Sequence, residues 1–230
     1  MLSVEKSTLA QIKPDKRIFI EILVIMAITI ASIFVTGFLK YVAELPAIIY
    51  LLVEMRIRKR SFHDIGFKLK NTPHDLLTNW HLILLVVIVF QLLPLLIGKY
   101  FLPGYIEHIK KRMPALVSDM SSKAVIMIIV AVLFCAIVTL YEEIIYRSLF
   151  MERLSWFVKP PFAIAIATLI FAGMHFTNGA PSVVLFDLIG VLADGIVYSI
   201  IFHKSKNIYA SWTAHFLADI VGIVLFMKMF

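Results

Sequence analysis

The sequence alternates between long apolar blocks and short charged segments. Six blocks are close to the length that crosses a membrane, because a spanning helix needs about 20 apolar residues. They cover residues 18–39, 81–97, 124–141, 162–176, 183–202 and 208–230. A shorter block at 41–53 contains Glu44 and Pro46 and is interpreted as a further helix. The pattern predicts an all-α, polytopic transmembrane helix bundle of about seven spans, with a range of six to eight.

The composition supports a chain that lies in lipid. Of the 230 residues, 61% are hydrophobic and 16% charged, and the mean hydropathy is +0.93. A soluble domain has roughly 45–50% apolar and about 25% charged residues. Residues 1–230 are therefore interpreted as a single transmembrane domain. The polar segment 1–17 precedes a long apolar block with no clear cleavage site, which indicates an uncleaved first span.

The distribution of positive charge indicates an orientation. The net charge of +7 could suit nucleic acid, but under the seven-span reading 15 of the 22 Lys and Arg residues fall on one side of the membrane. Cytoplasmic loops carry such an excess of Lys and Arg. We expect a multi-pass protein of the cell membrane with its N-terminus in the cytoplasm, and with lipid rather than nucleic acid around it. The single cysteine, Cys135, excludes an intrachain disulfide and is interpreted as a packing residue.

The stretch "TLYEEIIYRSLF" (139–150) places three charges at the end of an apolar run. Such charges are costly in a bilayer and usually mark function. Neighbouring helix residues point about 100° apart, so Glu142 and Glu143 cannot face the same partner. Glu143 and Arg147, at i,i+4, are predicted to form an ion pair, which leaves Glu142 as a candidate general base. In the alternative interpretation, all three residues only anchor the cytoplasmic end of the helix.

Three further polar residues lie in later blocks. His175 ends one apolar run, and His215 and Asp219 lie at i,i+4 on another. If the chain turns near residues 154–160, a rise of 1.5 Å per residue places Glu142 about 18 Å and His175 about 22 Å from that turn. His215 and Asp219 lie about 12 Å and about 18 Å from the same side. The depths are similar, so we expect the four side chains to converge.

Two imidazoles and two carboxylates around a water molecule suit two hydrolytic designs. In the first, His175, His215 and Asp219 bind a divalent metal such as Zn²⁺, while Glu142 deprotonates the metal-bound water. In the second, which needs no metal, Glu142 and His175 activate water, and His215 with Asp219 stabilises the oxyanion. The sequence contains none of the H-E-x-x-H, G-x-S-x-G and G-x-G-D signatures of other membrane proteases.

The order of these motifs resembles the CPBP family, which includes type II CAAX prenyl endopeptidases and the bacteriocin-processing or immunity proteins called Abi. The matching positions are Glu142, Glu143 and Arg147 (E-E-x-x-x-R), Phe171 and His175 (F-x-x-x-H), and His215 and Asp219 (H-x-x-x-N/D). The motifs cover about 139–222, within a catalytic core of about 123–230.

The resemblance implies an intramembrane endopeptidase with a cavity that opens to the cytosol. Glu142 would activate water with His175 as its partner, and His215 with Asp219 would bind the oxyanion or a metal. Glu143, Arg147 and Phe171 are interpreted as structural support. Asp219 stands where prenyl endopeptidases have Asn, which favours metal ligation. The substrate would be a membrane-associated peptide or protein, with or without a prenyl group.

Two other functions remain open from the sequence. One is a non-enzymatic membrane protein of the bacteriocin-immunity type, and the other is a transporter that uses Glu142 and Asp219 as proton sites. The two histidines favour the hydrolase, because transport needs only the acids. Asp187 and Asp194, at i,i+7, are outside the family pattern and either support the site or face a water-filled cavity.

Overall fold

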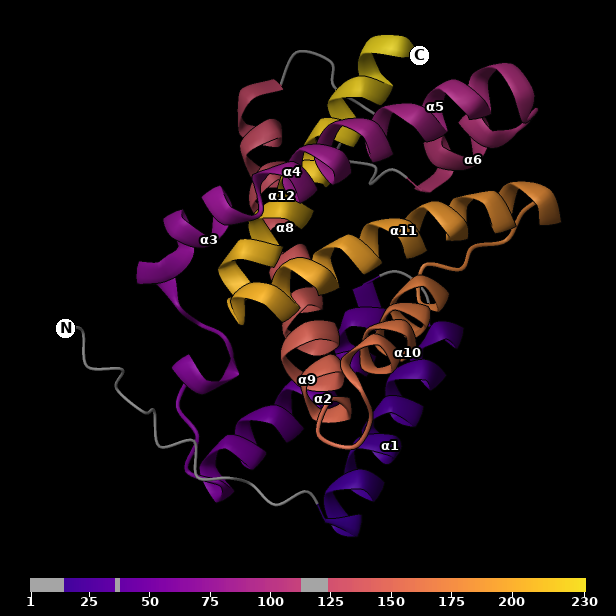
Figure 1. Ribbon diagram of the computed structural model, residues 1–230. Helices are drawn as coiled ribbons and strands as arrows, with labels where there is room; N and C mark the ends of the chain where they lie inside the picture. Colours follow the sequence, from indigo (N-terminus) through magenta and orange to yellow (C-terminus); the bar gives the residue numbers. More distant parts are fainter. Residues whose placement is uncertain (1–14, 36–37, 113–123) are drawn as a thin grey trace.

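The computed structural model describes residues 15–35, 38–112 and 124–230, and this part of the chain is built of helices without β-strands (Figure 1). The helices are α1 (Lys16–Ala31), α2 (Phe38–Ile57), α3 (Thr72–Thr78), α4 (Trp80–Leu84), α5 (Phe90–Phe101), α6 (Tyr105–Arg112), α8 (Ala124–Glu143), α9 (Glu152–Leu154), α10 (Pro160–Gly173), α11 (Pro181–Ser205) and α12 (Ile208–Met229). A π-helical stretch, Leu85–Val89, joins α4 to α5, and a second, Ile144–Met151, joins α8 to α9. The predicted all-α class is confirmed.

Five helical segments of the described chain are long and apolar enough to cross a membrane. They are Lys16–Phe34, Trp80–Phe101, Ile128–Leu154, Pro181–Ser205 and Ile208–Met229. The shorter apolar helix α10 and the 20-residue helix α2 bring the number to seven. About seven spans, as predicted, therefore agree with the structure.

The apolar block at 124–141 is shorter than the helix that contains it, which continues to Leu154, as the predicted turn near 154–160 requires. The ion pair of Glu143 and Arg147 lies inside this continuation. Helix α10 begins at Pro160, before the apolar block at 162–176, and ends at Gly173, before that block does. The chain turns at residues 155–159, within the range that the sequence predicted.

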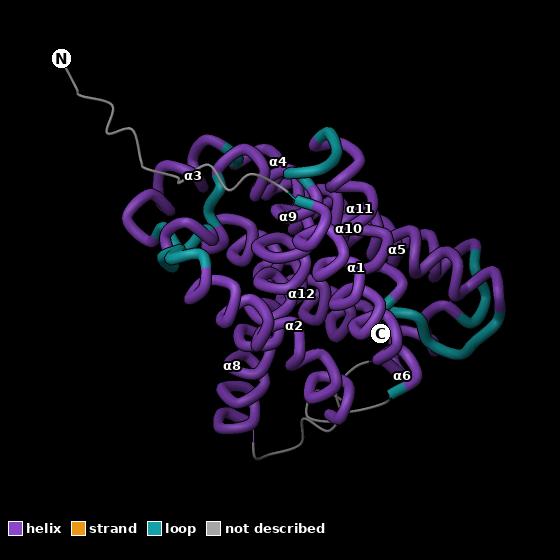
Figure 2. The backbone as a smooth tube through the Cα atoms, turned by 90° about the horizontal axis from the view of Figure 1, so that it is seen from below, coloured by secondary structure: helices purple, strands orange, loops and turns teal. Residues whose placement is uncertain are grey.

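Helices α8, α10, α11 and α12 form the C-terminal part of the bundle and pack against one another. α12 packs against α8 and α11, and α11 packs against α10, an arrangement that can be followed in Figures 1 and 2. Gly195 allows α11 to come close to α10, because a Cβ there would lie 2.7 Å from the Thr168 methyl and 2.9 Å from the Phe171 ring. This close crossing brings the C-terminal end of α10 near the last turn of α8 and the middle of α12.

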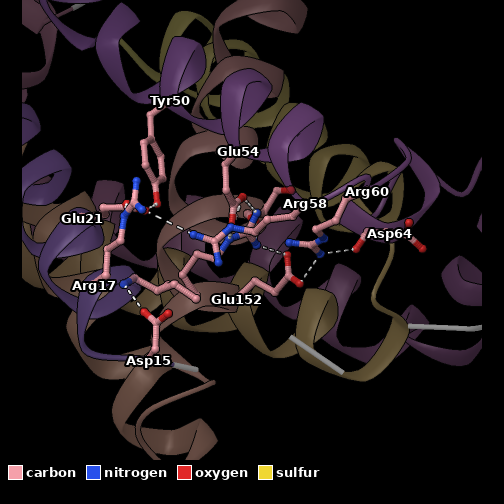
Figure 3. A network of polar contacts seen from close by, with 12 residues as sticks. Asp15, Arg17, Glu21, Tyr50, Glu54, Arg58, Arg60, Asp64 and Glu152 are labelled. Carbon is pink, nitrogen blue, oxygen red and sulfur yellow. Dashed lines mark hydrogen bonds and ion pairs between the residues drawn. The ribbon is translucent and has the colours of Figure 1, made fainter. Parts of the chain in front are cut away.

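A network of ion pairs lies at the end of the bundle that contains the 155–159 turn (Figure 3). Arg153 is fully buried, and its Nε donates to both carboxylate oxygens of Glu54 at 2.9 and 3.0 Å. Glu152 accepts from Arg153 at 2.7 Å and from Arg60 at 2.6 Å. The network also includes Glu21, Tyr50, Arg58 and Asp64. It ties α1, α2 and the loop after α2 to the end of the α8–α9 helix.

Candidate active site

Glu142 lies in the last turn of α8 between two imidazole rings. Its Oε1 is 4.0 Å from His175 Nε2, and its Oε2 is 3.7 Å from His215 Nε2. Asp219 Oδ2 is 3.9 Å from the same His215 nitrogen. The structure therefore brings together all four predicted site residues. Distances of this size are slightly longer than direct hydrogen bonds, as is common for catalytic groups without substrate.

The position of His175 differs from the expectation of a residue inside a helix. It follows the C-terminus of α10, and its backbone N–H donates to the Ala172 carbonyl. Its Nδ1 lies 2.9 Å from the Phe171 carbonyl oxygen, and its ring packs on the Phe171 ring at 4.6 Å. A carbonyl can only accept, so Nδ1 carries a proton, and in the neutral ring Nε2 is the acceptor nitrogen. The turn after α10 thus directs the basic nitrogen at Glu142.

His215 is held from two sides. Its Nδ1 lies 3.0 Å from Glu143 Oε1, and Tyr198 of α11 stacks on its ring at 4.4 Å with an interplanar angle of 19°. His215 as a whole residue is 4% exposed. A carboxylate on one imidazole nitrogen sets which nitrogen faces the site, here Nε2 toward Glu142 and Asp219. Sequence reasoning missed Tyr198, and no motif marks it, because the stacking depends on how α11 crosses α12.

Glu143 and Arg147 form the predicted ion pair, with Nη1 to Oε1 at 3.1 Å, and both are completely buried. Arg147 also donates to the Gly195 carbonyl at 3.2 Å and lies 4.5 Å above the centre of the Phe171 ring. Structural support was the predicted role, but Glu143 has a second contact that the sequence did not reveal. The oxygen that pairs with Arg147 also accepts from His215, so Glu143 links the ion pair to the site.

The residues outside the family pattern line a shared cavity. Asp187 and Asp194 both lie on its wall, so of their two expected environments the structure places them at the cavity. Asp187 lies 3.4 Å from Nε2 of the buried His108, and Asp194 accepts from Gln91 at 3.3 Å. Sequence reasoning missed both of these partners.

Cys135 and Asp219 also lie on this wall. The Cys135 thiol is 3.9 Å from Asp219 Oδ2, so the cysteine borders the cavity rather than only filling space between helices. The side chain of Asp219 is 43% exposed, unlike that of His215, which is 5% exposed. Asp219 is therefore placed to meet a ligand in the cavity.

The cavity has a volume of about 790 Å³ and mostly apolar walls. It extends from Glu142 along α8 to Ile128 and from His215 along α12 to Lys228. Figure 1 shows that the start of α8 and the end of α12 lie opposite the 155–159 turn. The predicted orientation places that turn on the cytoplasmic side. The described walls extend from the site toward the opposite end of α8 and α12. The entrance from the cytosol stays a prediction from the resemblance.

The same side chains are the candidates for binding a metal ion. Across the described ranges, no group of three or more His, Cys, Asp and Glu side chains is arranged to hold a metal ion. The predicted set of His175, His215 and Asp219 therefore does not form a metal centre in this arrangement. Zinc stays a prediction from the sequence, and we derive no step through a metal.

The fold is that of a multi-helix membrane protein. Its site, a glutamate between two histidines, is typical of a hydrolase. Residues 122–221 match the family model described as type II CAAX prenyl endopeptidase Rce1-like. The matched segment is 100 of 230 residues long and contains all seven motif residues. This segment is therefore similar to the type II CAAX prenyl endopeptidases, in agreement with the resemblance that the motifs carry. Comparisons with curated proteins and with solved structures gave no match.

Proposed function

We propose that this protein is an intramembrane endopeptidase that cleaves a membrane-associated, prenylated peptide or protein with water activated by Glu142. The observation that carries the proposal is the position of this carboxylate, between two imidazole Nε2 atoms at 3.7 and 4.0 Å on the wall of a large cavity. The family match supports proteolysis, and the activity for which that family is named supports a prenylated substrate.

The proposed reaction uses only side chains of this chain. A water molecule between Glu142 and His175 loses a proton to the carboxylate as its oxygen attacks the substrate carbonyl carbon. In its imidazolium form, His215 stabilises the resulting oxyanion with a hydrogen bond from Nε2 and keeps its proton. Glu142 then passes its proton to the amide nitrogen as the C–N bond breaks. The products are a new carboxyl group and a new amine, and Glu142 returns to its starting form.

The surroundings of the site assign supporting roles to its neighbours. Glu143 keeps the Nδ1 side of His215 occupied, so that Nε2 faces the substrate. The Phe171 carbonyl does the same for His175. The apolar cavity walls along α8 and α12 would receive the hydrophobic part of the substrate.

The proposal is tested with purified protein in detergent micelles or liposomes and a fluorogenic farnesylated CAAX-type peptide. We expect Glu142→Gln and His175→Ala each to lower kcat by about 10²–10⁴-fold, the usual contribution of a general base. Both variants should elute from size exclusion as the wild type does. Tyr50→Phe, which removes one hydrogen bond to Glu21 far from the site, is the matched control and should keep full activity.

Two results would contradict the proposal. Near-wild-type cleavage by the Glu142→Gln variant would show that Glu142 is not the base. A folded wild-type protein that cleaves neither the farnesylated peptide nor its unprenylated counterpart would remove the proposed function itself. Cleavage of both peptides at equal rates would keep the protease and remove the prenyl requirement.

A further inference from the structure

The first turn of α2 contacts both segments that carry the proposed base and its histidine partner. Lys40 Nζ donates to the backbone carbonyl of Met174, the residue before His175. The following residue of α2 is Tyr41. Its backbone carbonyl accepts a hydrogen bond from the Tyr141 hydroxyl at 2.9 Å. Tyr141 directly precedes Glu142. α2 lies outside the residues that match the family model, so this contact is a feature of the chain beyond the matched segment.

The Met174 carbonyl needs such a partner because α10 has ended. The last carbonyls of a helix have no partner within the helix, and a cation near the C-terminus of a helix is favourable. Met174 is the C-cap residue of α10, and its side chain is buried. The half-buried ammonium of Lys40 supplies both a hydrogen bond and a positive charge at this point. A lysine in a helix that crosses lipid is costly, which makes a purely accidental contact a poor explanation.

The position of His175 is determined by the turn after α10, because the residue lies beyond the end of that helix. Its position is set by the turn hydrogen bonds from His175 N to the Ala172 carbonyl and from Phe176 N to the Gly173 carbonyl, at 3.0 and 3.1 Å. The Lys40 contact fixes the carbonyl between these two bonds. Loss of the contact would let the turn open and move His175 Nε2 away from Glu142.

We propose that Lys40 is a positioning residue, which holds the turn after α10 so that His175 faces Glu142. This inference rests on the proposed function, since Lys40 touches neither the water nor the substrate in that reaction. Glu44, one turn along α2, and Glu142 are the acidic groups near the Lys40 ammonium.

The experiment compares Lys40→Met, Lys40→Arg and wild type by hydrogen–deuterium exchange and by kinetics with the farnesylated peptide. We expect Lys40→Met to exchange the amides of residues 174–177 about 10-fold faster, as for loss of one hydrogen bond of ordinary strength. Its kcat should fall about 10- to 100-fold with KM little changed, because a misplaced catalytic group slows the reaction without weakening substrate binding. Lys40→Arg, which keeps a charged donor, should restore both readouts in part. Tyr50→Phe removes a hydrogen bond at the other end of α2 and should change neither.

The two readouts separate this inference from the proposed function. Wild-type protein that cleaves no peptide, together with faster exchange at 174–177 in Lys40→Met, would remove the proposed function but keep the positioning contact. Unchanged exchange in Lys40→Met, or unchanged kcat per folded molecule in an active enzyme, would overturn the role of Lys40. If Lys40→Met does not fold, Lys40→Gln, which is polar but too short to reach the carbonyl, takes its place under the same criteria.

Discussion

Substitution of Glu143 by Gln tests how the buried charges support the site. The Glu143 carboxylate is 0% exposed, and its Oε1 lies 3.1 Å from Arg147 Nη1 and accepts a hydrogen bond from His215 Nδ1 at 3.0 Å. Glutamine has the same shape and keeps a carbonyl oxygen that both donors can reach. The substitution therefore removes the negative charge and little else.

The expected cost follows from what remains around Arg147. Loss of one partner of a buried ion pair costs about 3–5 kcal/mol, because the other charge is left without compensation. The guanidinium keeps its hydrogen bond to the Gly195 carbonyl and its place over the Phe171 ring, a contact of about 0.5–2 kcal/mol. Both contacts are present before and after the substitution. They therefore hold Arg147 in place but do not reduce the loss of stability that follows from removing the Glu143 charge. Arg147→Met should cost a similar amount, since it leaves the buried Glu143 carboxylate without its arginine partner.

The measurement is thermal unfolding of the single and double variants in one detergent. At about 2–4 °C per kcal/mol for a chain of this size, each single variant should lower the Tm by about 6–20 °C. The double variant buries neither charge and should lose less than the sum, with a coupling of about 2–3 kcal/mol. Glu142→Gln is the matched control. It is the same change one residue earlier, where the described chain shows no arginine partner, and it should shift the Tm far less.

Two outcomes would refute this reasoning. A Glu143→Gln variant as stable as the Glu142→Gln control would mean that the buried ion pair contributes no stability. Additive losses in the double variant would mean that the two charges do not interact. We also expect the folded Glu143→Gln protein to keep some activity, because its amide oxygen can still accept from His215. A stable but wholly inactive variant would instead place Glu143 in the chemistry.

Further predictions concern other parts of the molecule. Glu54→Gln should lower the Tm strongly, since it leaves the buried Arg153 without its main partner. The double variant Glu54→Gln/Arg153→Met should recover part of this loss, because it removes the unpaired charge. Tyr198→Leu should lower kcat while Tyr198→Phe keeps it, because only the ring stacks on the imidazole of α12; equal activities would exclude a role for the stacking. If the N-terminus is cytoplasmic, a cysteine replacing the exposed Ser61 should be protected from an impermeant thiol reagent in intact cells, and one replacing Tyr100 should react; the reverse pattern would invert the orientation. Metal analysis of the purified protein should find less than about one zinc per ten chains if the metal-free design holds, and stoichiometric zinc lost on chelation together with activity would establish the metal design.

The sequence determined those features that depend on neighbouring residues. Apolar blocks of sufficient length predicted the membrane helices, because the hydrocarbon thickness sets the length of a span. The i,i+4 spacing predicted the pair of Glu143 and Arg147, because helix geometry alone brings such residues together. Counting residues from the 155–159 turn predicted that His175 and His215 would reach the depth of Glu142, and the structure does bring them together.

Only the tertiary structure decided how the helices cross and which side chains meet there. The contact of Glu143 with His215, the ring of Tyr198 on that histidine and the reach of Lys40 to Met174 join helices that are far apart in the sequence. The course of the cavity along α8 and α12 is also set by helix packing. These features depend on the angle and spacing between helices. Both result from close packing of many side chains at once, and no local pattern of residues encodes them.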